Sequence, residues 1–235
     1  MTNLPAHFKT GLAYVRHWPH VRLALGLHPL ASEDHEREIL EFEPCLSQSS
    51  FVGEIGLDFS KQGKASAERQ LHSFRHVARL LARAPKFVSL HSRGAEREVL
   101  EILTENGVKC AVFHWYSGPV TVLDSLLQAG HSLSVSPAMT LSTKGQEIIR
   151  QLPRDRVLSE SDGPHARVHG APARPWDVQL VEKHLASIWG TSTADVRAQI
   201  SANFQGLVNR TRVNETPPTF GGEANRSAFV RDERR

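Results

Sequence analysis

Four residues have the chemistry of a divalent metal site: the carboxylates Glu54 and Asp162 and the histidines His91 and His114. Neutral imidazole and carboxylate together suit zinc, manganese and similar ions, and a bridging carboxylate suits a centre of two metals. Such a centre activates water near neutral pH and stabilises both the attacking and the leaving oxygen of a phosphodiester. The residue types therefore predict metal-dependent hydrolysis.

Two further residues are candidates for substrate binding. Arg93 follows His91 by two positions, and a guanidinium holds phosphate as a bidentate fork. His28 could bind phosphate in the same way or transfer a proton. Structural interpretations compete: a single strand-end histidine is more often hydrogen-bonded than metal-bound, and Glu54 alone fits a salt bridge equally well. Histidines 131, 165, 169 and 184 are interpreted as structural, Asp58 as a cap of the loop after its strand, and Glu160 as a hydrogen-bonding support.

The segment FVGEIGLDF, residues 51–59, is predicted to be the buried strand that positions Glu54. Side chains alternate along a strand, so Ile55 and Leu57 face one side, and Val52, Glu54, Gly56 and Asp58 face the other. A buried ionised carboxylate is costly unless it has a partner. Glu54 therefore requires a cation, a cluster of donors or a metal.

The rest of the chain alternates between predicted strands and helices. Strands are expected at 21–29, 51–59, 86–92, 109–118, 131–138 and 156–164; helices are expected at 11–20, 32–46, 65–83, 95–105, 142–152, 175–189 and 193–208, with another starting at Pro119. Strand followed by helix, six times, predicts a mostly parallel sheet. No GxGxxG follows an early strand, which disfavours a dinucleotide-binding open sheet. Five strands end with an acid or histidine on one face, as the catalytic edge of a TIM-type (β/α)8 barrel requires.

Composition indicates a globular protein of one domain. Of 235 residues, 40% are hydrophobic and 23% charged, and the formal charge of +3 is weak support for an anionic partner. The two cysteines are far apart, which argues against a disulfide framework or a zinc ribbon. Because neither a signal peptide nor a membrane-spanning apolar run is recognisable, a cytoplasmic location is expected. Residues 1–211 are predicted to form the barrel domain, and residues 212–235 a disordered polar tail.

Several motifs, in order and spacing, resemble those of TatD-type metal-dependent deoxyribonucleases, members of the amidohydrolase-like TIM-barrel superfamily. The matching runs are VGEIGLDF, LHSRGA, FHWYSG and LSESDGP, with GLHP around His28 and SANFQGL around Asn203. The likeness extends from about Val21 to Val208. The run SVSPAM followed by PRDRVLSESDGP is especially similar to the TatD-like subunits of Qat anti-phage defence systems.

The resemblance implies a role for each site residue. Glu54 would bridge two divalent ions (Mg, Mn or Zn), His91 and His114 would complete one site, and Asp162 would belong to the other and accept a proton. Glu160 and Asn203 would support these ligands without binding metal. The implied reaction is hydrolysis of DNA phosphodiesters, often from a 3′ end, and the implied partners are DNA and other proteins of a defence complex.

The resemblance also has a departure. The family opens with a strand that carries an HxHxD motif, and this motif is absent from the sequence. We therefore expect a barrel that is incomplete at its N-terminus, with about six of eight strands, and favour a start assigned too late over a truncated form. Two alternatives remain: an amidohydrolase-like enzyme acting on a small amide, lactone or phosphotriester, and a catalytically degenerate barrel that serves as a subunit.

Overall fold

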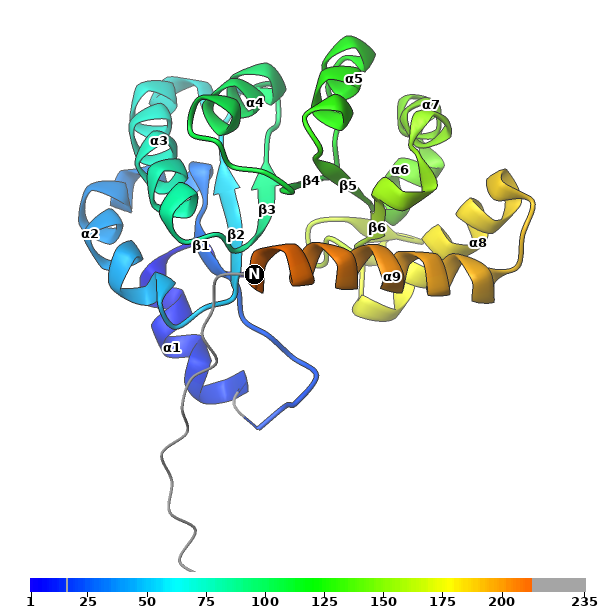
Figure 1. Ribbon diagram of the computed structural model, residues 1–235, viewed down its shortest axis with the longest axis horizontal. Coiled ribbons are helices and arrows are strands. Elements are labelled where there is room, and N and C mark those ends of the chain that lie inside the picture. Colours follow the sequence, from blue (N-terminus) through cyan, green and yellow to red (C-terminus); the bar gives the residue numbers. More distant parts are fainter. Residues whose placement is uncertain (16, 213–235) are drawn as a thin grey trace, which may run out of the picture.

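The computed structural model describes residues 1–15 and 17–212 (Figure 1). Its main sheet has six parallel strands in the order of the chain, β1 to β6, which confirms the predicted parallel α/β architecture. Among the described residues, β1 and β6 each pair with one neighbour, so the sheet is not closed into a barrel. The strands are β1 (Leu25–Leu27), β2 (Phe51–Gly56), β3 (Phe87–His91), β4 (Val112–His114), β5 (Ser132–Val135) and β6 (Val157–Ser159).

Helices α2 to α7 form an arc around the strands, whereas α9 runs across the other side from α8 towards β2 (Figure 1). The α-helices are α1 (Pro5–Val15), α2 (His35–Leu46), α3 (Ala67–Arg83), α4 (Glu96–Glu105), α5 (Val120–Gln128), α6 (Pro137–Leu141), α7 (Thr143–Gln151), α8 (Val178–Trp189) and α9 (Thr193–Arg212). Short 3-10 turns are η1 (Pro29–Asp34), η2 (Lys64–Ser66), η3 (Arg154–Arg156) and η4 (Pro175–Asp177), and a small hairpin joins β7 (Arg167–Val168) to β8 (Ala171–Pro172).

Several predicted boundaries were wrong. The first helix starts at Pro5, not at residue 11, because proline is well accommodated in a first helical turn. Ser32 lies inside η1 and does not cap α2. Helix α6 and the β7–β8 hairpin were not predicted, since segments of two to five residues carry too little periodicity to be recognised.

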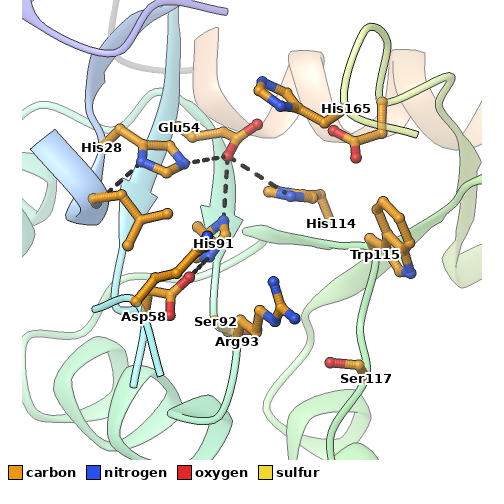
Figure 2. A pocket seen from close by; sticks show the side chains of 13 residues that line it. His28, Glu54, Asp58, His91, Ser92, Arg93, His114, Trp115, Ser117 and His165 are labelled. Atoms are coloured by element: carbon orange, nitrogen blue, oxygen red, sulfur yellow. Dashed lines mark hydrogen bonds and ion pairs between the residues drawn. The ribbon is translucent and has the colours of Figure 1, made fainter. Parts of the chain in front are cut away.

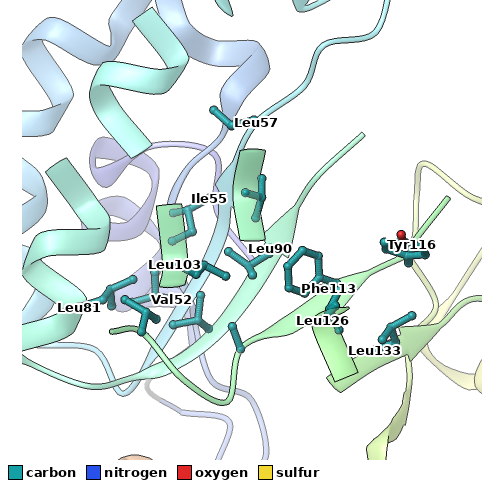
Figure 3. Packing of buried hydrophobic residues seen from close by; sticks show 14 of the residues in the cluster. Val52, Ile55, Leu57, Leu81, Leu90, Leu103, Phe113, Tyr116, Leu126 and Leu133 are labelled. Carbon is teal, nitrogen blue, oxygen red and sulfur yellow. The ribbon is translucent and has the colours of Figure 1, made fainter. Parts of the chain in front are cut away.

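The main core lies between the outer face of the sheet and the helices (Figure 3). Leu90 and Phe113 are fully buried and point towards helix residues such as Leu103 and Leu126. Helix α3 contributes Phe74, Val77, Ala78 and Leu81, whose three- to four-residue spacing gives it one apolar face. Each large apolar side chain buried in this way contributes about 1.5–3 kcal/mol.

Strand β2 departs from simple alternation before Glu54. Val52 was expected to share the face of Glu54, yet it is buried in the main core with Ile55 and Leu57. The pairing register of β2 with β3 shifts between Val52 and Ile55. An irregularity of this kind rotates the following residues relative to the preceding ones, so Val52 and Glu54 face different sides.

Helix α9 covers the inner face of the sheet near the start of the strands. Its Leu207 packs with Val112 and Leu158, two inward-facing strand residues. Its Phe204 ring is parallel to that of Phe51, with centroids 6.3 Å apart, and inclined to that of Phe87, with centroids 5.4 Å apart. The amino-terminal part of the inner face is therefore apolar, and polar groups are concentrated at the opposite edge.

The first residues of the chain lie against β1. The Thr2 hydroxyl donates to the Ala24 carbonyl at 2.8 Å and accepts from the Gly26 amide at 3.1 Å. A Cβ at position 26 would lie 1.6 Å from the Thr2 carbonyl oxygen, so this close approach requires glycine. The His28 amide donates to the Asn3 carbonyl at 2.8 Å, which links this opening segment to the start of the candidate site.

No helix in the described part of the chain is both long enough and apolar enough to cross a membrane. The predicted polar tail, residues 212–235, lies outside the described residues apart from Arg212, the last residue of α9.

Candidate metal-dependent active site

One edge of the sheet brings six predicted residues, Arg93 among them, to the wall of a single cavity of about 410 Å³ (Figure 2). His28 directly follows β1, Glu54 lies in β2, and His91 and His114 end β3 and β4. Asp162 comes three residues after β6. Because the strands are parallel, their carboxyl ends meet at this edge, where the active sites of barrel enzymes lie.

Glu54 is the centre of the arrangement. Its Oε2 lies 3.2 Å from His28 Nε2, 3.4 Å from His91 Nδ1 and 3.7 Å from His114 Nε2. Burial opposes ionisation of this carboxyl, but its contacts with the rings of His28, His91 and His114 outweigh it and lower the pKa of Glu54 below its ordinary value. An ionised carboxylate therefore faces three imidazoles.

Asp58 orients His91. The His91 ring places Nε2 2.9 Å from Asp58 Oδ2, and the Asp58 side chain is 0% exposed. With its proton on Nε2 and donated to Asp58, a neutral His91 has a lone pair on Nδ1, the atom that faces Glu54. That Nδ1 is buried and forms no hydrogen bond within the described structure. Histidines that bind metals are usually held in this way by a carboxylate on the second nitrogen.

The sequence predicted only part of the role of Asp58. Its Oδ1 accepts from the Ser60 amide at 2.8 Å, so it also caps the loop after β2, as expected. Burial opposes the charge of His91, but the hydrogen bond to Asp58 and the nearby Glu54 carboxylate raise the pKa of His91 to about 9. A metal ion at Nδ1 would compete with that proton, as it does at most metal sites.

His28 is built as a hydrogen-bond donor. Its Nδ1 accepts from the Leu30 amide at 3.2 Å, at the start of η1. An acceptor at Nδ1 leaves the ring proton on Nε2, which is directed at Glu54. In this tautomer Nε2 has no free lone pair, so His28 is better suited to donate to an anion than to bind a metal.

His114 and Asp162 form the second group around Glu54. Ligand-capable atoms of His28, Glu54 and His91 lie within 4.8 Å of one another, and so do those of Glu54, His114 and Asp162. Burial lowers the pKa of His114 to about 4, which leaves its imidazole neutral. Burial and the nearby charge of Glu54 raise the pKa of Asp162 to about 6. A cation between the two carboxylates would relieve their repulsion.

Glu160 supports the site from beside the ligands. Its two oxygens accept from the Trp115 amide at 2.8 Å and from the Ser134 hydroxyl at 2.5 Å. These bonds connect β5 and the segment after β6 to the residue that follows His114. Burial, despite the bond from Ser134, raises the pKa of Glu160 to about 8. The contacts match the supporting role expected for this residue.

Asn203 does not lie at the site. Its side-chain amide donates to the carbonyls of Arg154, at 2.7 Å, and Val157, at 2.8 Å. These carbonyls are at the start of β6, at the opposite end of the strand from Asp162. The contacts place Asn203 in a structural role, joining α9 to the sheet, and not in support of the ligands.

Several residues at the cavity were missed as site residues or assigned to structural roles. Among them, Asp58, Trp115 and His165 line it together with the predicted Arg93. Asp58 had a recognisable signal, since it shares the strand-face parity of Glu54. Trp115 and His165 follow His114 and Asp162 by one and three residues, in loops whose direction no periodicity predicts.

The donor set fits a divalent cation. His91 Nδ1 is buried without a hydrogen-bond partner, His114 is neutral, and Glu54 is ionised among them. Imidazole and carboxylate together suit the borderline ions. When bound, such an ion supplies a Lewis acid that activates water and polarises phosphoryl oxygens.

Known proteins are similar to this chain in sequence and in fold. The sequence profile of the family described as TatD related DNase matches residues 1–209. The human deoxyribonuclease TATDN3 is 27% identical over 206 residues, which cover 80% of this chain and 74% of that protein. The 3′-5′ ssDNA/RNA exonuclease TatD of Erwinia amylovora is 27% identical over 197 residues, which cover 77% of this chain and 76% of that one.

The solved structures agree with the sequence comparisons. The crystal structure of YJJV, a TatD homologue from Escherichia coli, superimposes with a TM-score of 0.80 at 25% identity and covers 88% of this chain and 84% of that one. The resemblance found in the motifs is thus confirmed for the chain from residue 1 to residue 209. The protein belongs to the TatD-related DNase family of metal-dependent hydrolases.

Proposed function

We propose that this protein hydrolyses phosphodiester bonds of DNA with divalent cations held around Glu54. The observation that carries the proposal is the convergence of His91, His114 and Asp162 around that one carboxylate, in a cavity open to a substrate. Family membership and relatives named as deoxyribonucleases support it. Divalent ions such as Mg²⁺, Mn²⁺ or Zn²⁺ would be held by these residues, and the family resemblance implies two of them.

Each residue takes the role that its contacts favour. Glu54, His91 and His114 would hold one cation, as the family resemblance implies, since both rings face the same Glu54 oxygen, and Asp58 would fix the tautomer of His91. Asp162 and Glu54 contribute to the second. Asp162, whose pKa of about 6 lies close to neutrality, accepts the proton of the attacking water.

Substrate binding falls to the cationic and donor groups on the cavity wall. Arg93 is exposed there, and its guanidinium suits bidentate binding of a phosphate that flanks the scissile bond. The Nε2–H group of His28 donates to a phosphate oxygen that enters beside Glu54. Both groups orient the phosphate without contributing to bond cleavage.

The test is cleavage of single-stranded DNA by the purified protein with Mg²⁺, Mn²⁺ or Zn²⁺ added in turn. Glu54→Gln should lower the rate by at least about 100-fold, since metal stabilisation of the transition state is worth several kcal/mol. Glu105→Gln, an exposed carboxylate on α4, is the matched control. Unchanged cleavage by Glu54→Gln would contradict the proposal.

Two other outcomes would favour the alternatives. Turnover of amides or lactones without DNA cleavage would indicate an amidohydrolase-like enzyme with a small substrate. Failure to bind metal, with tolerance of substitutions at Glu54 and Asp162, would indicate a degenerate barrel kept as a subunit.

We further propose that the protein acts in the cytoplasm, in anti-phage defence, together with partner proteins. The similarity of its SVSPAM and PRDRVLSESDGP runs to TatD-like subunits of Qat systems supports this role. Phage plating on cells that carry the gene with its genomic neighbours tests it, with Glu54→Gln as the inactive comparison. Equal plating efficiency with and without the gene would contradict it.

A further inference from the structure

Trp115 forms part of the cavity wall directly beside the metal-ligand candidates. It follows His114 in the chain and lines the same cavity as Glu54 and Arg93. Figure 2 shows it across the site from His28 and Asp58, with His91 and His114 between. Its side chain is partly exposed, so part of the indole remains accessible from the cavity.

The surrounding structure holds Trp115 in an unusual conformation. Its φ of +36° lies in the left-handed region, which a bulky residue rarely adopts and which costs about 1–3 kcal/mol. Two contacts offset this cost. Its amide donates to Glu160, and its side chain packs against a small apolar cluster formed by Ala166, Val168 and Ala173 around the β7–β8 hairpin.

These contacts hold the indole in place at one side of the cavity. The hairpin cluster supports it from one side, while the cavity lies on another. Arg93 provides a cation for phosphate on the same wall. A flat aromatic surface beside a phosphate-binding group is the combination that binds single-stranded nucleic acids without reading their sequence.

We propose that Trp115 is a stacking platform for the nucleobase of the nucleotide whose phosphate binds at Glu54 and Arg93. The inference rests on the proposed nuclease function and adds a specificity element to it. Every base has a π-face, so this contact tolerates all four bases. A base inside a duplex is covered by its neighbours, so the platform selects an unpaired nucleotide at the site.

A purely structural tryptophan would behave differently. If Trp115 only filled space against the hairpin cluster, its removal would weaken cleavage of every substrate equally. A stacking tryptophan loses its effect when the substrate has no base to stack. The coupling between one protein change and one substrate change therefore distinguishes the two roles.

The experiment compares single-stranded octathymidylate with oligomers in which one residue is an abasic tetrahydrofuran, placed at each position in turn. Trp115→Leu should lower kcat/KM on the intact oligomer by about 5- to 150-fold, mostly through KM. The kcat/KM of wild-type protein should fall by a similar factor on the oligomer that lacks the stacked base. The kcat/KM of Trp115→Leu should be little lower on that oligomer than on the intact one, and Trp115→Phe should have a kcat/KM close to that of wild type on the intact oligomer.

A binding assay in the Glu54→Gln protein, which has lost cleavage and lacks the Glu54 carboxylate that would repel the phosphate, separates stacking from catalysis. The fluorescence of 2-aminopurine at the sensitive position of the oligomer should be quenched by this protein and not when it also carries Trp115→Leu. Trp176→Leu, a 60% exposed tryptophan outside the cavity, is the matched control, and thermal unfolding checks that both variants are folded.

The outcomes separate the two proposals. Equal losses by Trp115→Leu on intact and abasic oligomers, or quenching that persists in that variant, would overturn the stacking role and leave the nuclease function standing. If wild-type protein neither cleaves nor binds any of the oligomers, the nuclease function fails and the platform with it.

Discussion

Replacing Asp58 by Asn is expected to impair metal binding without removing a metal ligand. Asp58 Oδ1 accepts from the Ser60 amide and Oδ2 faces His91 Nε2 at 2.9 Å. If the Asn oxygen keeps the Ser60 bond, its NH₂ group faces His91 Nε2. The imidazole must then accept at Nε2 and move its proton to Nδ1, the atom that faces Glu54 and the metal.

The size of the effect follows from these two bonds. Rotating the amide restores the histidine tautomer but sacrifices the Ser60 hydrogen bond, worth about 1 kcal/mol. It also replaces a buried charged acceptor by a neutral one, and hydrogen bonds to charged groups are worth about 1.5–3 kcal/mol. Metal affinity should therefore fall by about 10- to 100-fold, as is usual when the carboxylate partner of a ligating histidine is removed.

Isothermal titration with Mn²⁺ and Zn²⁺ measures this loss. The ¹⁵N chemical shifts of the imidazole report the tautomer in the Zn²⁺ samples, because Zn²⁺ is diamagnetic. Asp155→Asn, at a side chain that is 70% exposed, is the matched control. A proton on Nδ1 would show that the Asn oxygen keeps the Ser60 bond, and a proton on Nε2 that the amide has rotated. Unchanged metal affinity in Asp58→Asn would refute the reasoning.

Three further predictions concern stability. Burial and the charge of Arg156 lower the pKa of His131 to about 4 in the folded protein, from about 6.5 when unfolded. The neutral ring therefore stabilises the fold fully above pH 6.5, and this stabilisation is lost as the pH falls towards 4. In urea titrations, the unfolding free energy of wild type should fall between pH 7 and pH 5 by about 2 kcal/mol more than that of His131→Asn. An equal fall in the two proteins would contradict this prediction. Asn203→Ala should cost about 1–3 kcal/mol of unfolding free energy and leave Zn²⁺ affinity unchanged, because its bonds lie at the far end of β6; a weakened affinity would place it at the site after all. Gly56→Ala should destabilise the protein by clearly more than Gly107→Ala. Both glycines have a positive φ, but a Cβ at Gly56 would lie 2.0 Å from the His91 carbonyl oxygen, whereas a Cβ at Gly107 would have no atom within 4 Å. Equal unfolding free energies for the two glycine variants would show that the backbone of β3 can move away from the added Cβ at no cost in stability.

The sequence was sufficient to predict the parallel sheet and most of the cavity. Five of the six predicted strands end with an acid or histidine on one face, and parallel strands bring these ends together whatever the details of packing. By that rule His28, Glu54, His91 and His114 were expected at one edge, and all four line the same cavity. Asp162 follows its strand closely enough to share their edge.

Contacts that depend on loops and irregular backbone could not be predicted. The displacement of Val52 from the face of Glu54 arises from a register shift that leaves no mark in the alternation of residue types. The role of Asp58 depends on the rotation of the His91 ring, and the position of Trp115 depends on a left-handed backbone. Motif similarity also suggested a supporting role for Asn203, whereas its hydrogen bonds are to the beginning of β6.

Helix α9 ties the early strands of the sheet to the last one. Phe204 contacts Phe51 and Phe87, while Asn203, one residue earlier, holds the backbone around β6. This helix is the last element of the described chain, so the ribosome must release almost the whole domain before α9 can connect the first strands of the sheet directly to β6. We therefore expect Glu54 and Asp162 to be held together only after synthesis of α9. Metal would then be acquired by the finished chain and not by the nascent one.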